Sequence, residues 1–233
     1  MRRLYAAVAV ALLLASCAGR QREEPHVYSI PERLDQYGPT VQSRLAPIFA
    51  SAGISYPPHD LAFVAFKDTA TLEVYAMNQD DVAWKFVTRY PILAASGRAG
   101  PKLTEGDRQV PEGVYRVDWM NPNSCCHLSL HVTYPNAFDQ LQGARDGRVM
   151  LGGDIMIHGG AQSVGCLAMG DPASEDFFVL AALATPERVR VLISPTDFRA
   201  RERTDLPRDP AWIGELYDWL RIELRQFPQP ALN

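Results

Sequence analysis

Residues 155–169 read IMIHGGAQSVGCLAM, and this stretch carries more information about the protein than any other. An apolar run ends at His158, and a loop with glycines at 159, 160 and 165 brings Cys166 eight residues later. A cysteine nucleophile needs a base that can take its proton, and glycines let a substrate carbonyl approach the main chain. One interpretation is therefore a catalytic pair, in which the N–H groups of Gly165 and Cys166 form an oxyanion hole at the start of a helix.

A structural contact and a metal site are two other interpretations of the same pair. A lone cysteine near a lone histidine is more often structural than catalytic, because cysteine behaves as a small apolar residue. The spacing also suits two zinc ligands, but a structural zinc site usually has about four. Cys125, Cys126 and His127 are adjacent to one another and supply no second pair with suitable spacing. We expect no metal and no cofactor.

Strand-like runs and helical patterns alternate on both sides of this stretch. Apolar clusters and alternation predict strands over 61–67, 72–77, 84–90, 114–119, 127–132, 149–158 and 189–193. Three- and four-residue spacing predicts a helix that ends near Gly53, with Pro39 near its start. The same spacing predicts a helix over 174–184 and a closing helix over 212–224. These elements indicate a single α+β domain, rich in sheet, with helices at both ends.

The composition supports a folded domain and limits its partners. The 233 residues are 47% hydrophobic and 21% charged, which is enough for one sizeable core. A net charge of −4 argues against a nucleic-acid partner, since general nucleic-acid binders carry a basic excess. Four cysteines are too few for a small domain built on disulfides.

The N-terminus has the features of an export signal. Two arginines precede an apolar run from Leu4 to Leu14, and the run stops at Ala15-Ser16-Cys17. Leu14 to Cys17 resembles the bacterial lipobox, which implies that residues 1–17 are a lipoprotein signal peptide and that Cys17 is acylated. Residues 18–30 are then a tether. Ala18 in place of an aspartate implies sorting to the outer membrane, so we expect a periplasmic, lipid-anchored protein.

The central stretch also resembles a known enzyme family. His158-Gly159 followed by Ser163-Val164-Gly165-Cys166 resembles the signature of L,D-transpeptidases with a YkuD-type catalytic domain. Residues 95–115 resemble the family's Gly-Asp and Pro-x-Gly-x-Tyr segment. Residues 121–137 resemble its lipoprotein-associated branch, in which the loop from histidine to cysteine is short. The likeness runs from about residue 61 to about residue 195.

This resemblance implies a fold, a reaction and a substrate class. The fold is α+β, mostly β: a YkuD-like, β-sandwich-type single catalytic domain with flanking helices. Residues 31–200 would hold the catalytic domain with its N-terminal helix, and 201–233 the C-terminal helix. The partner is the peptide stem of peptidoglycan, with the membrane reached only through the lipid anchor. No cofactor is implied.

In the implied mechanism Cys166 attacks the carbonyl at the L-centre of diaminopimelate and forms a thioester, which an amine resolves. His158 is the general base, and Ser163, Gly165 and Cys166 shape the oxyanion pocket. The other binding candidates are Gly159, His127 and Arg108.

Several alternatives stay open at this point. Val164 and Ala168 stand where many members of the family carry His and Arg or Asn, so the contacts made there cannot be transferred. Water could resolve the thioester, which would give an L,D-carboxypeptidase, or an amidase that releases a cross-linked lipoprotein. A non-catalytic peptidoglycan-binding lipoprotein is a further alternative, which fast alkylation of Cys166 at mildly acidic pH would exclude.

Two further groups of residues have no counterpart that fixes their role. Cys125 and Cys126 match nothing in the family and are expected to be non-catalytic, although a disulfide to Cys166 would inactivate the enzyme if they lay close. Arg98, Lys102 and Arg108 are loop residues that either bind the carboxylates of the stem or form a solvated basic surface.

Overall fold

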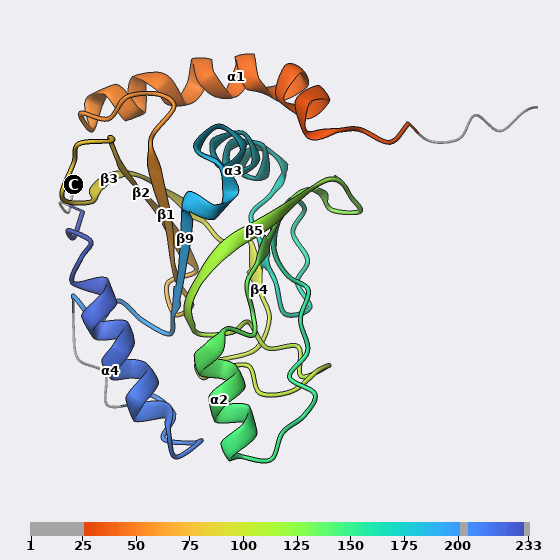
Figure 1. Ribbon diagram of the computed structural model, residues 1–233, viewed down its shortest axis with the longest axis vertical. Helices are drawn as coiled ribbons and strands as arrows, with labels where there is room; N and C mark the ends of the chain where they lie inside the picture. The colour runs from red at the N-terminus through yellow and green to blue at the C-terminus, as the bar shows by residue number, and fades with distance from the viewer. Residues whose placement is uncertain (1–25, 201–204, 231–233) are drawn as a thin grey trace, which may run out of the picture.

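The computed structural model describes residues 26–200 and 205–230, and these residues form one mixed sheet of nine strands with four α-helices (Figure 1). The strands are β1 (Asp60–Phe66), β2 (Thr71–Met77), β3 (Lys85–Pro91), β4 (Ala94–Ala95), β5 (Gly113–Ser124), β6 (His127–Val132), β7 (Ile155–His158), β8 (Leu167–Ala168) and β9 (Val189–Ser194). The helices are α1 (Ile30–Ser51), α2 (Ala137–Arg145), α3 (Asp171–Ala184) and α4 (Ile213–Leu224), with a short 3-10 helix η1 (Pro186–Arg188).

Strand β5 joins the two halves of the sheet, whose order is β3-β2-β1-β9-β5-β6-β7-β8-β4. Its first four residues pair with β9, and its residues from Val117 onward pair with β6. A register shift between Val117 and Trp119 lies where the pairing changes, and such irregularities bend a strand. Figure 1 shows β5 curving across the molecule, so that the two halves lie at an angle. The predicted sheet-rich α+β fold is confirmed, with a single sheet folded on itself.

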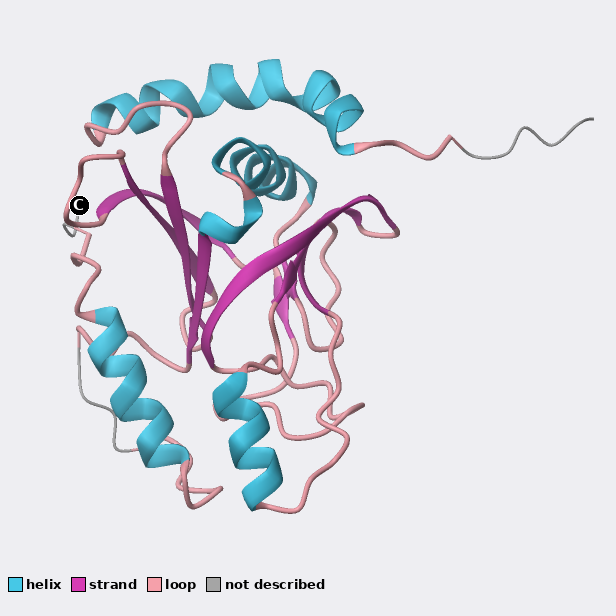
Figure 2. Ribbon diagram, viewed as in Figure 1, coloured by secondary structure: helices cyan, strands magenta, loops and turns pink. Residues whose placement is uncertain are grey.

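Helix α3 lies in the angle between these halves, and α1 covers it from outside (Figure 2). Phe177 of α3 packs against Phe63 of β1 and Tyr90 of β3, with ring centroids 4.9 and 4.8 Å apart. Nine of the 14 residues of α3 are buried, as expected for a helix that is apolar around most of its circumference. The predicted helix over 174–184 and strand over 189–193 therefore form the centre of the domain.

Helix α1 begins earlier than the sequence suggested. Ser29 and Glu32 form a reciprocal capping box at its N-terminus, and Pro39 lies inside the helix, so the expected start near Pro39 is wrong. The residues before the helix are also held, because Tyr28 exchanges two hydrogen bonds with Asn123 of β5, at 2.8 and 2.7 Å. The segment predicted as a tether therefore meets the folded domain before its predicted end at residue 30.

Three further elements differ from their sequence-based predictions. Helix α2 was not predicted, although Asn136 and Asp139 form the capping box that begins it. The strand expected over 149–158 begins only at Ile155, and the residues before it form a loop that contains Gly152 and Gly153. Strand β5 extends five residues beyond the expected end at 119, to Ser124. Its extension carries the β5–β6 turn.

Candidate active site

The parallel pairing of β7 and β8 places His158 and Cys166 on one face of the sheet. Ile157 lies opposite Leu167 and His158 opposite Ala168, so the same register, continued by one residue, puts Cys166 beside Met156. Ile157 and Leu167 point into the main core. Because side chains alternate along a strand, Met156, His158 and Cys166 point to the other face. Residues far apart in an extended chain are thus brought together by two short strands.

The thiol of Cys166 is bound by the main chain of the segment leading into β7. The Met156 N–H donates to its sulfur at 3.4 Å, and the sulfur lies 3.6 Å from the carbonyl oxygen of Asp154, to which the thiol donates. Burial raises the pKa of Cys166, while the Met156 N–H and the charge of Lys102 act in the opposite direction. The resting cysteine is therefore a protonated thiol. Burial argues against the fast alkylation at mildly acidic pH that the sequence suggested for an activated cysteine.

His158 is buried, and its orientation is fixed by its neighbour. Its Nδ1 lies 2.6 Å from the carbonyl oxygen of Gly159. Since a carbonyl oxygen only accepts hydrogen bonds, Nδ1 carries the ring proton and Nε2 is left as the proton acceptor. A general base requires this tautomer. The main chain supplies the group that orients the histidine, which the sequence could not identify.

The predicted oxyanion donors are occupied by two serine hydroxyls. Ser163 Oγ accepts from the Cys166 N–H at 3.2 Å and donates to the Cys166 carbonyl oxygen at 2.7 Å. Ser96 Oγ accepts from the Gly165 N–H at 2.6 Å, and the Ser96 N–H donates to Ser163 Oγ at 3.1 Å. No helix starts here either, because Cys166 leads into β8 and α3 begins only at Asp171. The expected helix start at this loop is wrong, whereas the oxyanion role of the two N–H groups stays a prediction.

Ser96 is the site residue that sequence reasoning missed. It directly follows β4, which pairs with β8, and this pairing brings it to Ser163 and Gly165. The loop after it is anchored from below, since Lys67 Nζ donates to the carbonyl oxygens of Gly100 and Val110, both at 3.0 Å. Lys67 also forms a buried ion pair with Glu112, 3.0 Å away. In the sequence, the only signal for Ser96 is the family resemblance of residues 95–115.

Gly159 and His127 meet where the β5–β6 turn packs against the catalytic loop. A Cβ on Gly159 would lie 2.7 Å from the Cys126 carbonyl oxygen, 2.7 Å from Asp171 Oδ1 and 2.9 Å from His127 Cβ. Only glycine fits this position, so it is a point of close packing, and its predicted contact with substrate stays a prediction. His127 Nε2 is 2.9 Å from Glu175 Oε1 of α3, which makes His127 a tie between the turn and α3.

The basic loop residues divide into one buried and two exposed side chains. Lys102 is only 6% exposed and lies 2.6 Å from Asp107 Oδ1, so it helps to fold the loop. Arg98 and Arg108 are exposed, and Arg108 has a left-handed φ of 54°. A cavity of about 930 Å³ next to Ser96 is lined by Arg98, Gln109 and residues of the segment 205–210. Its lining carries both charges, with Arg98 and Arg208 beside Asp107, Asp205 and Asp209.

A second hollow lies beside the loop that leads into β7. It measures about 480 Å³ and is lined by residues 149–153, with Glu105, Pro135 and Gln140. Its last lining residue, Gly153, precedes Asp154, whose carbonyl oxygen faces the Cys166 thiol. Val149 and Met150 in its wall are 90% and 62% exposed, so this hollow offers apolar contacts. This hollow therefore approaches the residue whose carbonyl oxygen holds the Cys166 thiol.

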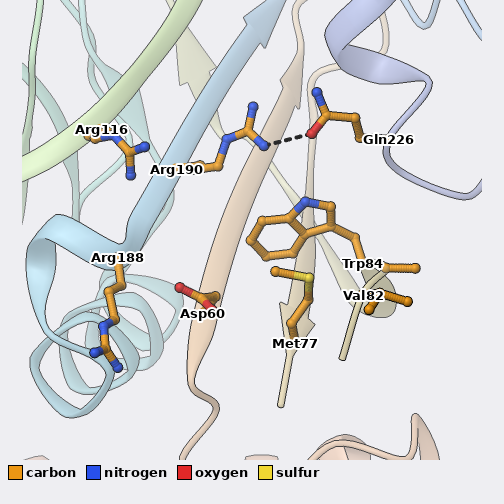
Figure 3. Close-up of a pocket in the computed structure, with 9 residues that line it drawn as sticks. Asp60, Met77, Val82, Trp84, Arg116, Arg188, Arg190 and Gln226 are labelled. Atoms are coloured by element: carbon orange, nitrogen blue, oxygen red, sulfur yellow. Dashed lines mark hydrogen bonds between the residues drawn. The ribbon is translucent and has the colours of Figure 1, made fainter. Parts of the chain in front are cut away.

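A third cavity lies away from these residues. Figure 3 shows Arg116, Arg188 and Arg190 around a space of about 490 Å³ beside Trp84 and Met77. Arg190 is held by Gln226, at 3.0 Å, and by Glu223. The cavity shares no lining residue with residues 155–169, and we assign it no part in the cysteine chemistry.

Other predicted features lie outside this site. Cys17, the predicted signal peptide and most of the predicted tether are outside the described residues. Across residues 26–200 and 205–230, no helix is both long and apolar enough to cross a bilayer. In the same two ranges, no cluster of three His, Cys, Asp or Glu side chains is arranged to hold a metal ion.

Comparison with known proteins places these residues in a family context. The family model for YkuD, the L,D-transpeptidase catalytic domain, matches residues 62–193. The chain is 32% identical over 115 residues to the putative L,D-transpeptidase YafK of Escherichia coli K12. That match covers 48% of this chain and 44% of YafK, so the chain aligns with less than half of the relative's length.

Two solved structures resemble the chain at lower sequence identity. The helical cell shape determining protein Pgp2 from Campylobacter jejuni is 24% identical, with a TM-score of 0.48, over 59% of this chain and 48% of Pgp2. Mycobacterium tuberculosis L,D-transpeptidase 1 is 15% identical, with a TM-score of 0.33, over 58% of this chain and 62% of that protein.

Proposed function

The chain belongs to the YkuD family of L,D-transpeptidase catalytic domains, and we propose that it is a cysteine acyltransferase of diaminopimelate-containing peptidoglycan stems. Cys166 is the nucleophile and His158 the general base. The observation that carries the proposal is their common face on β7 and β8, together with a His158 ring fixed through Nδ1. A histidine held through Nδ1 keeps Nε2 for proton transfer, which is the atom that a general base uses.

The acylation step begins with a proton transfer within this pair. Cys166 leaves its contact with the Asp154 carbonyl oxygen, and His158 Nε2 takes its proton. The sulfur then attacks the carbonyl carbon of the stem, the amide C–N bond breaks, and His158 returns the proton to the departing amine. The products are a Cys166 thioester and a free D-amino acid. In the second step an acceptor amine attacks the thioester and restores the thiol.

Before substrate binds, the two oxyanion donors are already hydrogen-bonded to serine hydroxyls. The oxygen of the attacked carbonyl competes with Ser96 Oγ and Ser163 Oγ for the N–H groups of Gly165 and Cys166. Exchange of a hydroxyl for a developing oxyanion is favourable, because a charged acceptor forms the stronger hydrogen bond. Ser96 and Ser163 thus hold the donors in place until the substrate arrives.

A carbapenem tests the acylation step, since these drugs mimic the acyl donor of this family. Incubation with the full-length protein should add one drug mass to Cys166, measured by intact mass and peptide mapping. Cys166→Ala should abolish the adduct, and His158→Ala should slow its formation by about 10²–10⁴-fold. Cys125→Ser is the matched control and should label like the parent. An adduct on Cys125 or Cys126, with Cys166 unmodified, would refute the assignment.

Hydrolysis is the second candidate, and it is favoured by the apolar residues at positions 164 and 168 near Cys166. Val164 is 71% exposed, and Ala168 is fully buried, so neither position supplies the polar contact that would hold an acceptor amine. Purified protein incubated with sacculi separates the two reactions by muropeptide mass spectrometry. New cross-linked or amino-acid-exchanged muropeptides support transfer, whereas shortened stems or released lipoprotein fragments without them establish a hydrolase.

The proposed location of the protein rests on its N-terminal sequence. Residues 1–17 would direct export and residues 18–30 would tether the domain to an acylated Cys17, with the periplasmic side of the outer membrane as its site. The catalytic domain over 31–200 and the C-terminal segment over 201–233 would then face the cell wall.

A further inference from the structure

Cys125 and Cys126 are the two central residues of the turn that joins β5 and β6. Ser124 and His127 pair across the turn, and the Cys126 N–H donates to Ser124 Oγ at 3.1 Å. The two sulfur atoms lie 3.6 Å apart, and both cysteines are free thiols. Cys125 is exposed and Cys126 is half-buried. The turn therefore presents a reduced, accessible dithiol.

This turn is one contact away from the group that orients His158. The Cys126 carbonyl oxygen packs directly against Gly159, where a Cβ would lie 2.7 Å from it. The carbonyl oxygen of the same Gly159 accepts the 2.6 Å hydrogen bond from His158 Nδ1. Asp171 closes the same side of Gly159, and its Oδ1 also accepts from the Gly160 N–H at 2.8 Å. Gly159 is therefore in close contact with the turn.

The residue after the turn is conformationally restricted as well. His127 has a φ of 73°, which is uncommon for a residue with a side chain, and its ring is tied to Glu175 and packs edge-on against Tyr37. The turn is thus fixed at its end by contacts with α1 and α3. His127 is therefore held in place on the side of the turn away from the two cysteines.

We propose that Cys125 and Cys126 are a redox modification site, at which formation of a vicinal disulfide displaces the Gly159 carbonyl and misaligns His158. The oxidant is a disulfide, such as oxidised glutathione. A Cys125 thiolate attacks it and expels one thiolate, and Cys126 then attacks the mixed disulfide and expels the second. Two protein thiols lose two protons and two electrons, and the small disulfide becomes two thiols.

The order of attack and the structural consequence follow from the geometry. Burial and the neighbouring Cys125 raise the pKa of Cys126, so the exposed Cys125 is the first nucleophile. Consecutive Cα atoms are about 3.8 Å apart, whereas disulfide-linked residues usually lie about 4.4–6.8 Å apart. The trans peptide fixes the first distance, so the ring closes only by rotation about the side-chain torsions and the backbone torsions between the two Cα atoms. A change of φ at Cys126 shifts its carbonyl, which contacts Gly159.

The functional effect rests on the proposed function, but the modification itself does not. Full-length protein is treated with oxidised glutathione and digested without reduction. The peptide that contains residues 125 and 126 should lose two hydrogen atoms, while Cys166 remains open to alkylation. The NMR signal of the His158 Nδ1 proton should shift on oxidation and return with reductant. Continued alkylation of both turn cysteines, or a disulfide from either one to Cys166, would overturn the proposal.

Carbapenem acylation then measures the consequence for activity. Oxidation should slow acylation of Cys166 by at least about tenfold, since small misplacement of a catalytic group has effects of this size or larger. Cys125→Ser, treated in the same way, should keep the rate of its reduced form. Equal loss in Cys125→Ser would mean that Cys166 itself is the oxidised residue. If the reduced parent is not acylated at all, the proposed function fails. The peptide mapping and the His158 signal still test whether the Cys125–Cys126 disulfide forms and displaces His158.

Discussion

Ser96 Oγ lies 2.6 Å from the Gly165 nitrogen, although the two residues are 69 positions apart in the chain. The contact exists because β4 pairs with β8, which brings the start of the loop after β4 to the end of the loop before β8. Ser96 also donates its own N–H to Ser163, and Ser163 in turn holds both main-chain groups of Cys166. The two serines form a continuous hydrogen-bonded support for the nucleophile.

Replacement of Ser96 by alanine tests this support. The variant removes the hydroxyl that accepts from the Gly165 N–H, while the Ser96 main-chain N–H still donates to Ser163 Oγ, so the catalytic loop keeps only part of its tie to β4. We expect Ser96→Ala to slow acylation of Cys166 by about tenfold and to destabilise the fold by about 0.5–1.5 kcal/mol. Carbapenem acylation kinetics and denaturant unfolding measure the two effects. A variant that acylates as fast as the parent would show that the serine has no supporting role.

Gly159→Ala tests the close packing beside His158. The new methyl group would overlap the Cys126 carbonyl oxygen, the Asp171 carboxylate and His127 Cβ. We expect a loss of about 1–3 kcal/mol in the free energy of unfolding, measured with denaturant, together with slower acylation. Gly214→Ala is the matched control, since a Cβ at Gly214 in α4 meets nothing within 4 Å. Gly214→Ala should not be destabilised. Wild-type stability of Gly159→Ala would contradict the packing.

The pH dependence of Cys166 alkylation follows from its burial. Its pKa is raised, so the thiolate fraction at a given pH is smaller than for an unstructured cysteine, and the difference disappears only above the raised pKa. We expect the iodoacetamide rate of Cys166 to rise with pH and its midpoint to lie above that of a short cysteine peptide. Quenched labelling followed by mass spectrometry gives both profiles. A midpoint below that of the peptide would show that the resting cysteine is activated.

Lipidation of Cys17 is tested outside the described part of the chain. The basic and apolar run that ends in Leu14-Ala15-Ser16-Cys17 predicts cleavage before Cys17 and acylation of its amino and thiol groups. Intact-mass analysis of protein extracted from membranes should show an acylated N-terminal cysteine. The Cys17→Ser variant should not be acylated and should be absent from the membrane fraction. An unmodified product that begins at another residue would disprove the prediction.

Local signals in the sequence accounted for much of the fold. The apolar run into His158, the helical spacing over 174–184 and the apolar strand over 189–193 were recognised because each depends on residues near one another in the chain. Two helix starts were missed although their signals are local: the capping boxes at Ser29 and Asn136. The prolines in α1 concealed the first, and the shortness of α2 concealed the second.

The sequence by itself determined which residues carry the proposed chemistry, because His158 and Cys166 lie within one strand-loop-strand segment whose spacing is local. The tertiary structure alone decided the state of the groups around them. Ser96, Lys67 and the Cys125–Cys126 turn reach the site through strand pairing and packing across the sheet. Such contacts join residues far apart in the chain, and no periodicity encodes which partner a main-chain N–H finds. For that reason the oxyanion donors were predicted by position, but their occupation by serine hydroxyls was not.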